Sequence, residues 1–378
     1  MIARTSETIV APGFEPVAQA FESILSEAPS YSAALCVYVD SVPCLDIWGG
    51  PAQSHEGVQV LFSATKGAVA LCVARLVQHG LLDLDAPVAS IWPEFGQAGK
   101  SEAPIRWLLS HRMGLPTVDV PLAGMADLAN TPMLVHALEQ QEPYWEPGTT
   151  HGYHPWTYGT LIGEVVRRVT GVSIGQFFAT EIAGPLGLDF WIGLPEPVEP
   201  RVVPLRSDAL SLTHESDALD AEARDPASLT SRTVSNGLQD LTTGCNQREF
   251  RAAEIPGANG VASARALARM YASCLGPVDG FRLLDDAILK QFCEQESGGV
   301  DRIFMEETRY GLGFMLPFPR KPFAGPMSFG HDGAAGALAF ADREHGFSFA
   351  FLPDLFPVLG GVDPHANALV AEVLKVLR

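Results

Sequence analysis

The sequence predicts an α/β protein whose antiparallel sheet is built from both ends of the chain. Two β-rich stretches, 33–48 and 337–352, lie near the ends, and the middle of the chain is helical and rich in turns. The chain has 378 residues and 47% hydrophobic content, which is enough to bury a large core and argues against disorder. This length also favours two domains, or one domain with a substantial insertion.

The first β-rich stretch predicts a hairpin. Residues 33–39 (AALCVYV) and 44–48 (CLDIW) are apolar runs of strand length. The connection 40–43 (DSVP) separates them, and Gly49 and Gly50 close the unit.

The second β-rich stretch predicts another hairpin, followed by a helix. Residues 337–341 and 347–352 flank the polar connection 342–346 (DREHG). Asp363 and Pro364 are helix start signals, and apolar residues then recur at helical spacing at positions 369, 370, 373, 374 and 377. We therefore expect the chain to end in a helix.

The middle of the chain contains one clear helix, expected from about 157 to 169. Its apolar residues recur at helical spacing: Leu161, Ile162, Val165 and Val166. The stretch from 197 to 246 is polar and only weakly periodic, so it is either a long surface excursion or a lid.

The charge balance and the apolar pattern exclude several kinds of partner. With 25 basic and 44 acidic residues the net charge is −19, which argues against nucleic acid or an anionic membrane surface as the main ligand. Residues 1–10 lack the basic and apolar regions of a signal peptide, and no apolar stretch reaches a membrane-spanning length. Six cysteines lack C-x-x-C spacing, so we expect reduced thiols and a cytoplasmic protein.

A serine and a lysine near the first hairpin form the candidate catalytic pair. Ser63 and Lys66 precede residues 67–76, which are apolar enough for a buried helix that Ser63 would open. Residues at i and i+3 share a helix face, so the ammonium can reach the hydroxyl, and helix N–H groups would favour an oxyanion there. With only five lysines in the chain, about 0.3 such pairs are expected by chance. The alternative is a helix-capping serine with a surface lysine.

Tyr153 is the candidate third member of this site. At the start of so apolar a helix Lys66 is partly desolvated, which lowers its pKa and suits it to accept a proton. Residues 145–148 (WEPG) form a turn that delivers Tyr153 to a loop, with His154 as helix cap and Pro155 at the first helical position. A phenol on that loop can point into a cleft.

Taken in order, segments spread over most of the chain resemble the class C β-lactamase, DD-peptidase and family VIII carboxylesterase superfamily. Ser63-Ala64-Thr65-Lys66 resembles its S-x-x-K motif, and 109–116 (LSHRMGLP) resembles its L-S-H-x-x-G-L-P segment. Other segments fall in family order: 146–148, 153–154, 184–188, 260–265 and 330–334.

The resemblance implies a fold and a division into domains. We expect an antiparallel sheet flanked by helices, formed by residues 1–75 and 290–378. We expect a mostly helical inserted domain at 76–289, with the active site in the cleft between the two. There Ser63 would be the nucleophile, and Lys66 and Tyr153 would take its proton.

The segment 330–334 (GHDGA) resembles the third family motif, K-T-G or H-x-G, on a strand beside the site. The resemblance implies that the N–H groups of Ser63 and Ala334 form the oxyanion hole. His331 and Gly333 would line the substrate site, where glycine lets a ligand approach the backbone closely. The alternative for His331 is a core or surface histidine before a turn.

Two departures from the family pattern bear on the substrate. Pro155 stands where β-lactamases of this class have the asparagine of Tyr-x-Asn, and His331 stands where they have a lysine. Both changes favour neutral esters, so we expect a serine esterase acting on small short-chain carboxylic esters. No H-E-x-x-H or Cys/His cluster suggests a metal, and we expect no cofactor. The alternatives are a β-lactamase or DD-peptidase, an acyltransferase, and a non-catalytic scaffold.

Overall fold

The computed structural model describes residues 7–122, 124–207, 217–234, 241–357 and 361–378. Its main sheet has six antiparallel strands in the order β1-β3-β2-β11-β10-β9. The strands are β1 (Ile9–Val10), β2 (Ala33–Val39), β3 (Val42–Gly49), β9 (Ser328–Asp332), β10 (Leu338–Asp342) and β11 (Phe347–Pro353). The predicted antiparallel sheet built from both ends of the chain is therefore confirmed, as are both hairpins.

The connection of the first hairpin is shorter than predicted. Asp40 and Ser41 have φ values of 49° and 66°, so both lie in the left-handed region that a two-residue type I′ hairpin turn requires. Val42 and Pro43 already belong to β3. The predicted four-residue connection 40–43 was wrong because the turn geometry needs only two residues.

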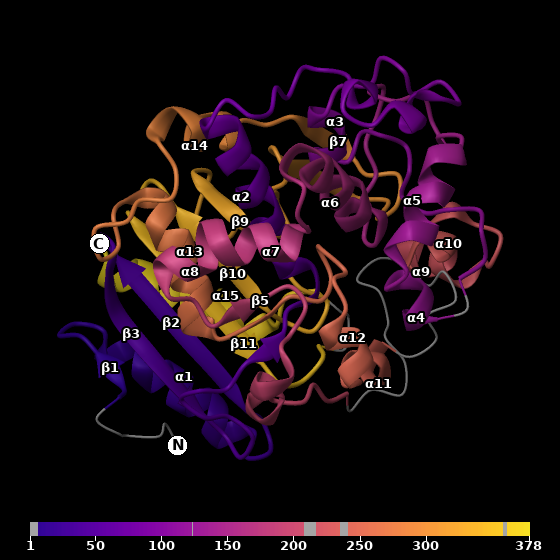
Figure 1. Cartoon of the computed structure of the whole chain (residues 1–378). Helices are drawn as coiled ribbons and strands as arrows, with labels where there is room; N and C mark the ends of the chain where they lie inside the picture. Colours follow the sequence, from indigo (N-terminus) through magenta and orange to yellow (C-terminus); the bar gives the residue numbers. More distant parts are fainter. Residues whose placement is uncertain (1–6, 123, 208–216, 235–240, 358–360) are drawn as a thin grey trace.

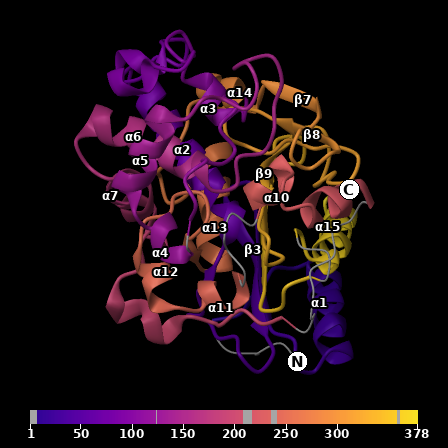
Figure 2. The same ribbon diagram turned by 90° about the vertical axis from the view of Figure 1, so that its right-hand side faces the viewer.

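Helices cover both faces of the main sheet, α1 (Glu15–Glu27) and α15 (Pro364–Val376) on one side and α13 (Ala264–Leu275) on the other. Figure 2 shows α1 and α15 side by side on the right, with α13 on the opposite side of β3. Leu35 of β2 packs with the first pair, whereas its neighbour Cys36 packs with α13, as strand alternation requires. The predicted C-terminal helix is confirmed, and the Asp363 side chain caps it.

The middle of the chain supplies most of the remaining helices, a three-stranded sheet and a two-stranded ribbon. The small sheet has the order β4 (Gln59–Val60), β6 (Val261–Ala262), β5 (Phe190–Trp191), and the ribbon is β7 (Ser297–Val300) with β8 (Glu307–Tyr310). The longer helices are α2 (Thr65–Gln78), α5 (Thr131–Gln140), α6 (Thr157–Thr170), α9 (Asp217–Arg224) and α14 (Asp286–Cys293). Figure 1 shows α4, α5, α9 and α10 on the right, away from β1, β2 and β3.

Short helical segments complete this part of the chain. They are η1 (Phe62–Ala64), η2 (Val88–Ser90), η3 (Pro93–Gly96), α3 (Arg106–Leu109), α4 (Met125–Leu128), α7 (Ile174–Phe178), η4 (Ala179–Ala183), α8 (Gly184–Leu186), η5 (Glu196–Arg201), α10 (Leu229–Val234), α11 (Leu241–Cys245) and α12 (Arg248–Ala252). In the part of the chain that the structure describes, no helix combines the length and apolarity needed to cross a membrane.

Two sequence expectations concern the middle of the chain. Helix α13 falls inside the range 76–289 predicted for the inserted domain, yet it packs on the main sheet. The division into two domains stays a prediction, with α13 on the sheet side. Of the stretch 197–246, residues 208–216 and 235–240 lie outside the described residues. The described part contains most of η5 and the helices α9, α10 and α11, joined by irregular segments.

Helix α2 is the buried helix that the sequence predicts. Residues 65–74 are all buried, which is typical of a helix that is apolar on every side and packed on every side. It contacts α6, α7 and β9, so it lies between the sheet and the helical part of the molecule. Ser63 does not open this helix as expected; it lies in the short turn η1 that leads directly into α2.

Candidate active site

The structure brings Ser63, Lys66 and Tyr153 together. The Tyr153 hydroxyl donates a hydrogen bond to Ser63 Oγ at 2.7 Å, and Lys66 Nζ lies 3.2 Å from the same oxygen. Ser63 and Lys66 come from η1 and the first turn of α2, whereas Tyr153 comes from the loop before α6. One hydroxyl therefore lies between two groups that can carry a proton.

Lys66 is fully buried, and backbone carbonyl groups hold it. Its Nζ donates to the carbonyl oxygen of Pro155 at 3.0 Å and to that of Gly257 at 2.9 Å. Burial lowers the pKa of Lys66 to about 7, although the nearby Asp332 carboxylate favours the charged form. Neutral and charged lysine are thus both accessible near neutral pH, as the apolar helix predicts.

A buried carboxylate holds Tyr153 in position. Asp301 Oδ1 accepts hydrogen bonds from the backbone N–H of Tyr153 at 3.1 Å and of Ile303 at 2.8 Å. The ring of Phe304 stacks on the Tyr153 ring with centroids 4.9 Å apart. Burial raises the pKa of Tyr153 well above its ordinary value, so the phenol keeps its proton at rest. No sequence pattern indicated Asp301, because its contact with Tyr153 joins residues 148 positions apart.

The segment after Tyr153 differs from the prediction. Helix α6 begins at Thr157 with Trp156 before it, so His154 is not the helix cap and Pro155 is not its first residue. Instead His154 Nε2 accepts a hydrogen bond from the Leu115 N–H at 3.0 Å. The carbonyl oxygen of Pro155 accepts a hydrogen bond from Lys66.

The residue before Ser63 has a strained backbone. Phe62 has φ of 46°, in the left-handed region that bulky residues rarely adopt. Its ring contacts Phe356 edge-on with centroids 5.6 Å apart. Packing of this kind holds a costly conformation in place, and such strain concentrates at functional sites. No sequence pattern indicated it.

The third motif lies against the segment that leads into the turn carrying Ser63. A Cβ at Gly333 would lie 2.1 Å from the carbonyl oxygen of Leu61, so only glycine lets the two segments approach this closely. Ala334 and Ser63 line the same cavity. His331 is 1% exposed, its Nδ1–H donates to the Asp332 carbonyl oxygen, and its ring lies 5.9 Å from that of Tyr153. The side chain on this strand that lines the cavity is Asp332.

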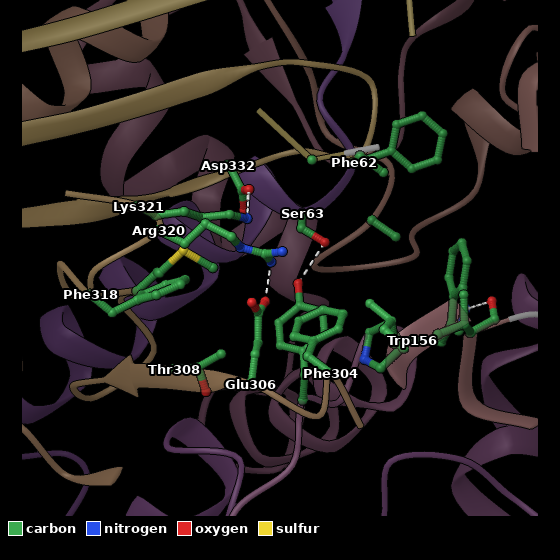
Figure 3. A pocket seen from close by; sticks show the side chains of 18 of the residues that line it. Phe62, Ser63, Trp156, Phe304, Glu306, Thr308, Phe318, Arg320, Lys321 and Asp332 are labelled. Atoms are coloured by element: carbon green, nitrogen blue, oxygen red, sulfur yellow. Dashed lines mark hydrogen bonds and ion pairs between the residues drawn. The ribbon is translucent and has the colours of Figure 1, made fainter. Parts of the chain in front are cut away.

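The cavity has one charged wall and several apolar walls. Figure 3 shows the ion pairs Lys321–Asp332 and Arg320–Glu306 to the left of Ser63, and Trp156 to the right. Apolar side chains line much of the remainder: Phe62, Trp156, Leu219, Val234, Leu241, Phe304, Met315 and Phe318. No local sequence pattern indicated this charged wall. Glu306, the neighbours Arg320 and Lys321, and Asp332 come from three separate segments of the chain.

A second serine lies in a pattern typical of hydrolases but has a structural role. Residues 171–175 (GVSIG) match G-x-S-x-G, the nucleophile turn of α/β-hydrolases. Ser173 caps α7 by accepting a hydrogen bond from the Gln176 N–H. Its hydroxyl donates to Glu254 at 2.6 Å. Both bonding directions of Ser173 are thus used by the fold.

The structure offers little for a metal ion. Within the described residues, no group of three His, Cys, Asp or Glu side chains is placed to hold one.

His111, which lies behind the site, accepts a hydrogen bond at Nδ1 from the His154 N–H at 3.2 Å. Burial lowers the pKa of His111 well below its ordinary value, so its ring is neutral.

Comparisons with known proteins identify the family of this chain. The Beta-lactamase family matches residues 17–372. The esterase/beta-lactamase LipL of Mycobacterium tuberculosis is 31% identical over 90% of this chain and 81% of its own. The structure of EstA from Arthrobacter nitroguajacolicus Rue61a has a TM-score of 0.90 and 37% identity over 98% of each chain. That of a family VIII carboxylesterase has a TM-score of 0.88 and 30% identity over 100% of each chain. This chain therefore belongs to the beta-lactamase family and is a serine hydrolase.

Proposed function

We propose that this protein is a carboxylesterase that hydrolyses short-chain esters through an acyl-enzyme on Ser63. The observation that carries the proposal is the hydroxyl of Ser63 held between Lys66 and Tyr153 at the base of a largely apolar cavity. Two related proteins bear names of the same kind, the esterase/beta-lactamase of M. tuberculosis and the family VIII carboxylesterase.

In this proposal Lys66 is the base in acylation. Neutral lysine has two N–H groups, which donate to the carbonyl oxygens of Pro155 and Gly257, and its lone pair then faces Ser63 Oγ. Ser63 Oγ attacks the ester carbonyl carbon while its proton passes to Lys66 Nζ. The N–H groups of Ser63 and Ala334 stabilise the resulting oxyanion.

Tyr153 acts in the second half of acylation. Its phenol keeps its proton at rest and lies 2.7 Å from Ser63 Oγ, so it can reach an alcohol oxygen that leaves the carbon attached to Oγ. It protonates the leaving alkoxide as the C–O bond breaks, and the Lys66 ammonium restores the phenol. Water then attacks the acyl carbon while Lys66 Nζ takes a proton from it. As the bond from the acyl carbon to Ser63 Oγ breaks, the Lys66 ammonium returns that proton to Oγ, and the carboxylic acid is released.

The expected substrates are neutral esters rather than lactams. A lactam antibiotic presents an acylamide and a carboxylate, and Pro155 has no side-chain amide to bind the first. His331 replaces the lysine of β-lactamases, and burial lowers the pKa of His331, so its ring is neutral. Each polar group left without a partner costs about 1 to 3 kcal/mol.

The proposal is tested by comparing kcat/KM for para-nitrophenyl butyrate with that for a chromogenic cephalosporin. We expect much faster turnover of the butyrate, and slow lactam turnover limited by deacylation of Ser63. A series of esters with increasing acyl length would then define the preference. Equal or faster turnover of the cephalosporin would replace the esterase with a β-lactamase.

A β-lactamase or DD-peptidase is the second candidate, favoured by the name of the M. tuberculosis relative. An acyltransferase, which would pass the acyl group to an alcohol, is separated by adding an alcohol acceptor and measuring the transfer product. Labelling of Ser63 by a fluorophosphonate would exclude a non-catalytic scaffold.

We also propose a cytoplasmic location, supported by six cysteines that form no disulfide, of which four are buried.

A further inference from the structure

The charged wall of the cavity consists of two ion pairs that differ in depth. In the pair Lys321–Asp332 the side chains are 13% and 6% exposed, whereas in Arg320–Glu306 they are 34% and 17% exposed. All four side chains line the cavity that contains Ser63. The deeper pair is therefore the one less screened by solvent.

Asp332 lies close to the reacting groups. It is the last residue of β9, directly before Gly333, which contacts the segment leading to Ser63. Its charge raises the pKa of both Lys66 and Tyr153, although burial determines the net shift of each. Burial alone would raise the pKa of Asp332, but Lys321 and His331 outweigh it and keep that pKa far below its usual range. Asp332 is therefore ionised.

We propose that the Lys321–Asp332 pair selects substrates by charge, so that the site accepts uncharged esters and rejects esters that carry a carboxylate. This inference rests on the proposed esterase function and names its substrate class. Asp332 forms an ion pair with the ammonium group of Lys321. Without Asp332, this ammonium group could bind a substrate carboxylate. The pair thus makes a wall with two charges but no net charge.

The physical reason is the cost of a third charge beside a buried pair. A substrate carboxylate at this wall meets the ionised Asp332, and the attraction of Lys321 is already used. Charges interact several times more strongly in such a site than in water, so like charges there discriminate against the wrong ligand. A neutral ester meets no such barrier. Arg320, the other cation on the wall, is paired with Glu306.

The test is a charge series at the two positions. Asp332→Asn leaves Lys321 with a net positive charge, Lys321→Met leaves a net negative charge, and the double variant is neutral again. For each protein, kcat/KM is measured for para-nitrophenyl butyrate and for two anionic esters. Mono-para-nitrophenyl succinate carries its charge on the acyl side, and para-carboxyphenyl butyrate carries it on the alcohol side.

We expect Asp332→Asn to raise the anionic-to-neutral ratio of kcat/KM by about tenfold or more for at least one anionic ester. Lys321→Met should raise the corresponding ratio for a cationic ester, the para-nitrophenyl ester of trimethylammoniobutyrate. The double variant should return both ratios toward those of the wild type. Asp279→Asn is the matched control, because it breaks an exposed pair with Arg269 outside the cavity.

Unchanged ratios in folded Asp332→Asn, or an equal rise in Asp279→Asn, would overturn the charge selection. If Asp332→Asn does not fold, Lys321→Met decides, and an unchanged cationic ratio overturns it. Wild-type turnover of the butyrate ester separates the two proposals. If the wild type hydrolyses that ester and the ratios stay fixed, only charge selection fails. If it hydrolyses no ester, the esterase proposal fails as well.

Discussion

Two fully buried lysines in this protein have nearly the same surroundings but opposite positions on a helix. Lys66 donates to the carbonyl oxygens of Pro155 and Gly257, and Lys100 donates to those of Glu139 and Gln141. Lys66 lies at the N-terminus of α2, where the helix dipole disfavours a cation, whereas Lys100 lies at the C-terminus of α5, where the dipole favours one. Burial lowers the pKa of Lys66 to about 7 and that of Lys100 to about 8.

This difference shows what turns a buried lysine into a candidate base. Burial and a pair of carbonyl acceptors are common to both, so neither feature alone marks a catalytic group. Lys66 differs from Lys100 in two ways. It lies at the N-terminus rather than the C-terminus of a helix, and it has a third hydrogen-bonding neighbour, the hydroxyl of Ser63. We therefore expect changes around Lys66 to affect catalysis, and a change at Lys100 to affect stability.

The largest effect is expected from removing the third neighbour. Ser63→Ala leaves Lys66 with two carbonyl acceptors only, as at Lys100, and removes the proposed nucleophile. Turnover of para-nitrophenyl butyrate should fall by about 10⁴-fold or more, with the fold intact. Steady-state kinetics and circular dichroism of the purified variant provide the check. Unchanged turnover would remove the assignment of the site, since Ser173 is occupied in capping α7.

The next effect concerns Lys66 and Tyr153, the two groups proposed to carry the proton. Lys66→Met and Tyr153→Phe should each lower kcat by about 10²-fold or more. The double variant should be little worse than the singles, because groups in one proton relay act as a unit. A double-mutant cycle in kcat measures this coupling. Additive losses would mean that the two side chains work separately.

A smaller effect is expected from pH. Lys66 must be neutral to accept a proton, and its pKa is about 7, so kcat/KM should fall about tenfold per pH unit below 7 and level off above. The free energy of unfolding should also depend on pH. Because the ordinary lysine pKa is 10.5, the unfolded chain binds the proton between about 7 and 10.5, and stability should rise with pH across that window.

Lys66→Met is the control for the stability effect. It has no proton to lose, so its free energy of unfolding should lack the rise that Lys66 contributes to the wild type. Denaturant unfolding of both proteins at several pH values measures the difference. A rate profile whose rising limb lies near pH 10 would show that Lys66 is an ordinary charged lysine.

The sequence predicted the parts of the site that depend on local spacing. Ser63 and Lys66 are three residues apart at the start of a uniformly apolar helix. Residues with this spacing in a helical turn lie close together, so their contact could be predicted from the sequence. The hairpins and the C-terminal helix follow from periodicity in the same way. Tyr153, 90 residues from Ser63, was found from a loop between turn and helix signals and from the order of family motifs.

The parts that the sequence did not predict depend on contacts that exist only in the folded chain. Lys321 and Asp332, 11 positions apart, meet because the segment before β9 folds back on that strand, and Asp301 meets Tyr153 across 148 positions. No periodic pattern records such pairs. The positive φ of Phe62 also has no signal in its residue type, because the surrounding packing imposes it.

The smallest catalytic effect, and the sharpest contrast, is expected at Lys100. Lys100→Met removes the two hydrogen bonds that Lys100 makes to the carbonyl groups at the end of α5. Those acceptors stay buried without a donor, so the protein should lose about 1 to 3 kcal/mol of stability. Because the side chain contacts no group of the site, kcat/KM should stay within about twofold of the wild type. Thermal unfolding and ester kinetics on one preparation measure both quantities. A large loss of turnover at an unchanged melting temperature would contradict this contrast. It would mean that the position of a lysine at one or the other end of a helix does not decide whether it takes part in catalysis, and that burial with two carbonyl partners is enough.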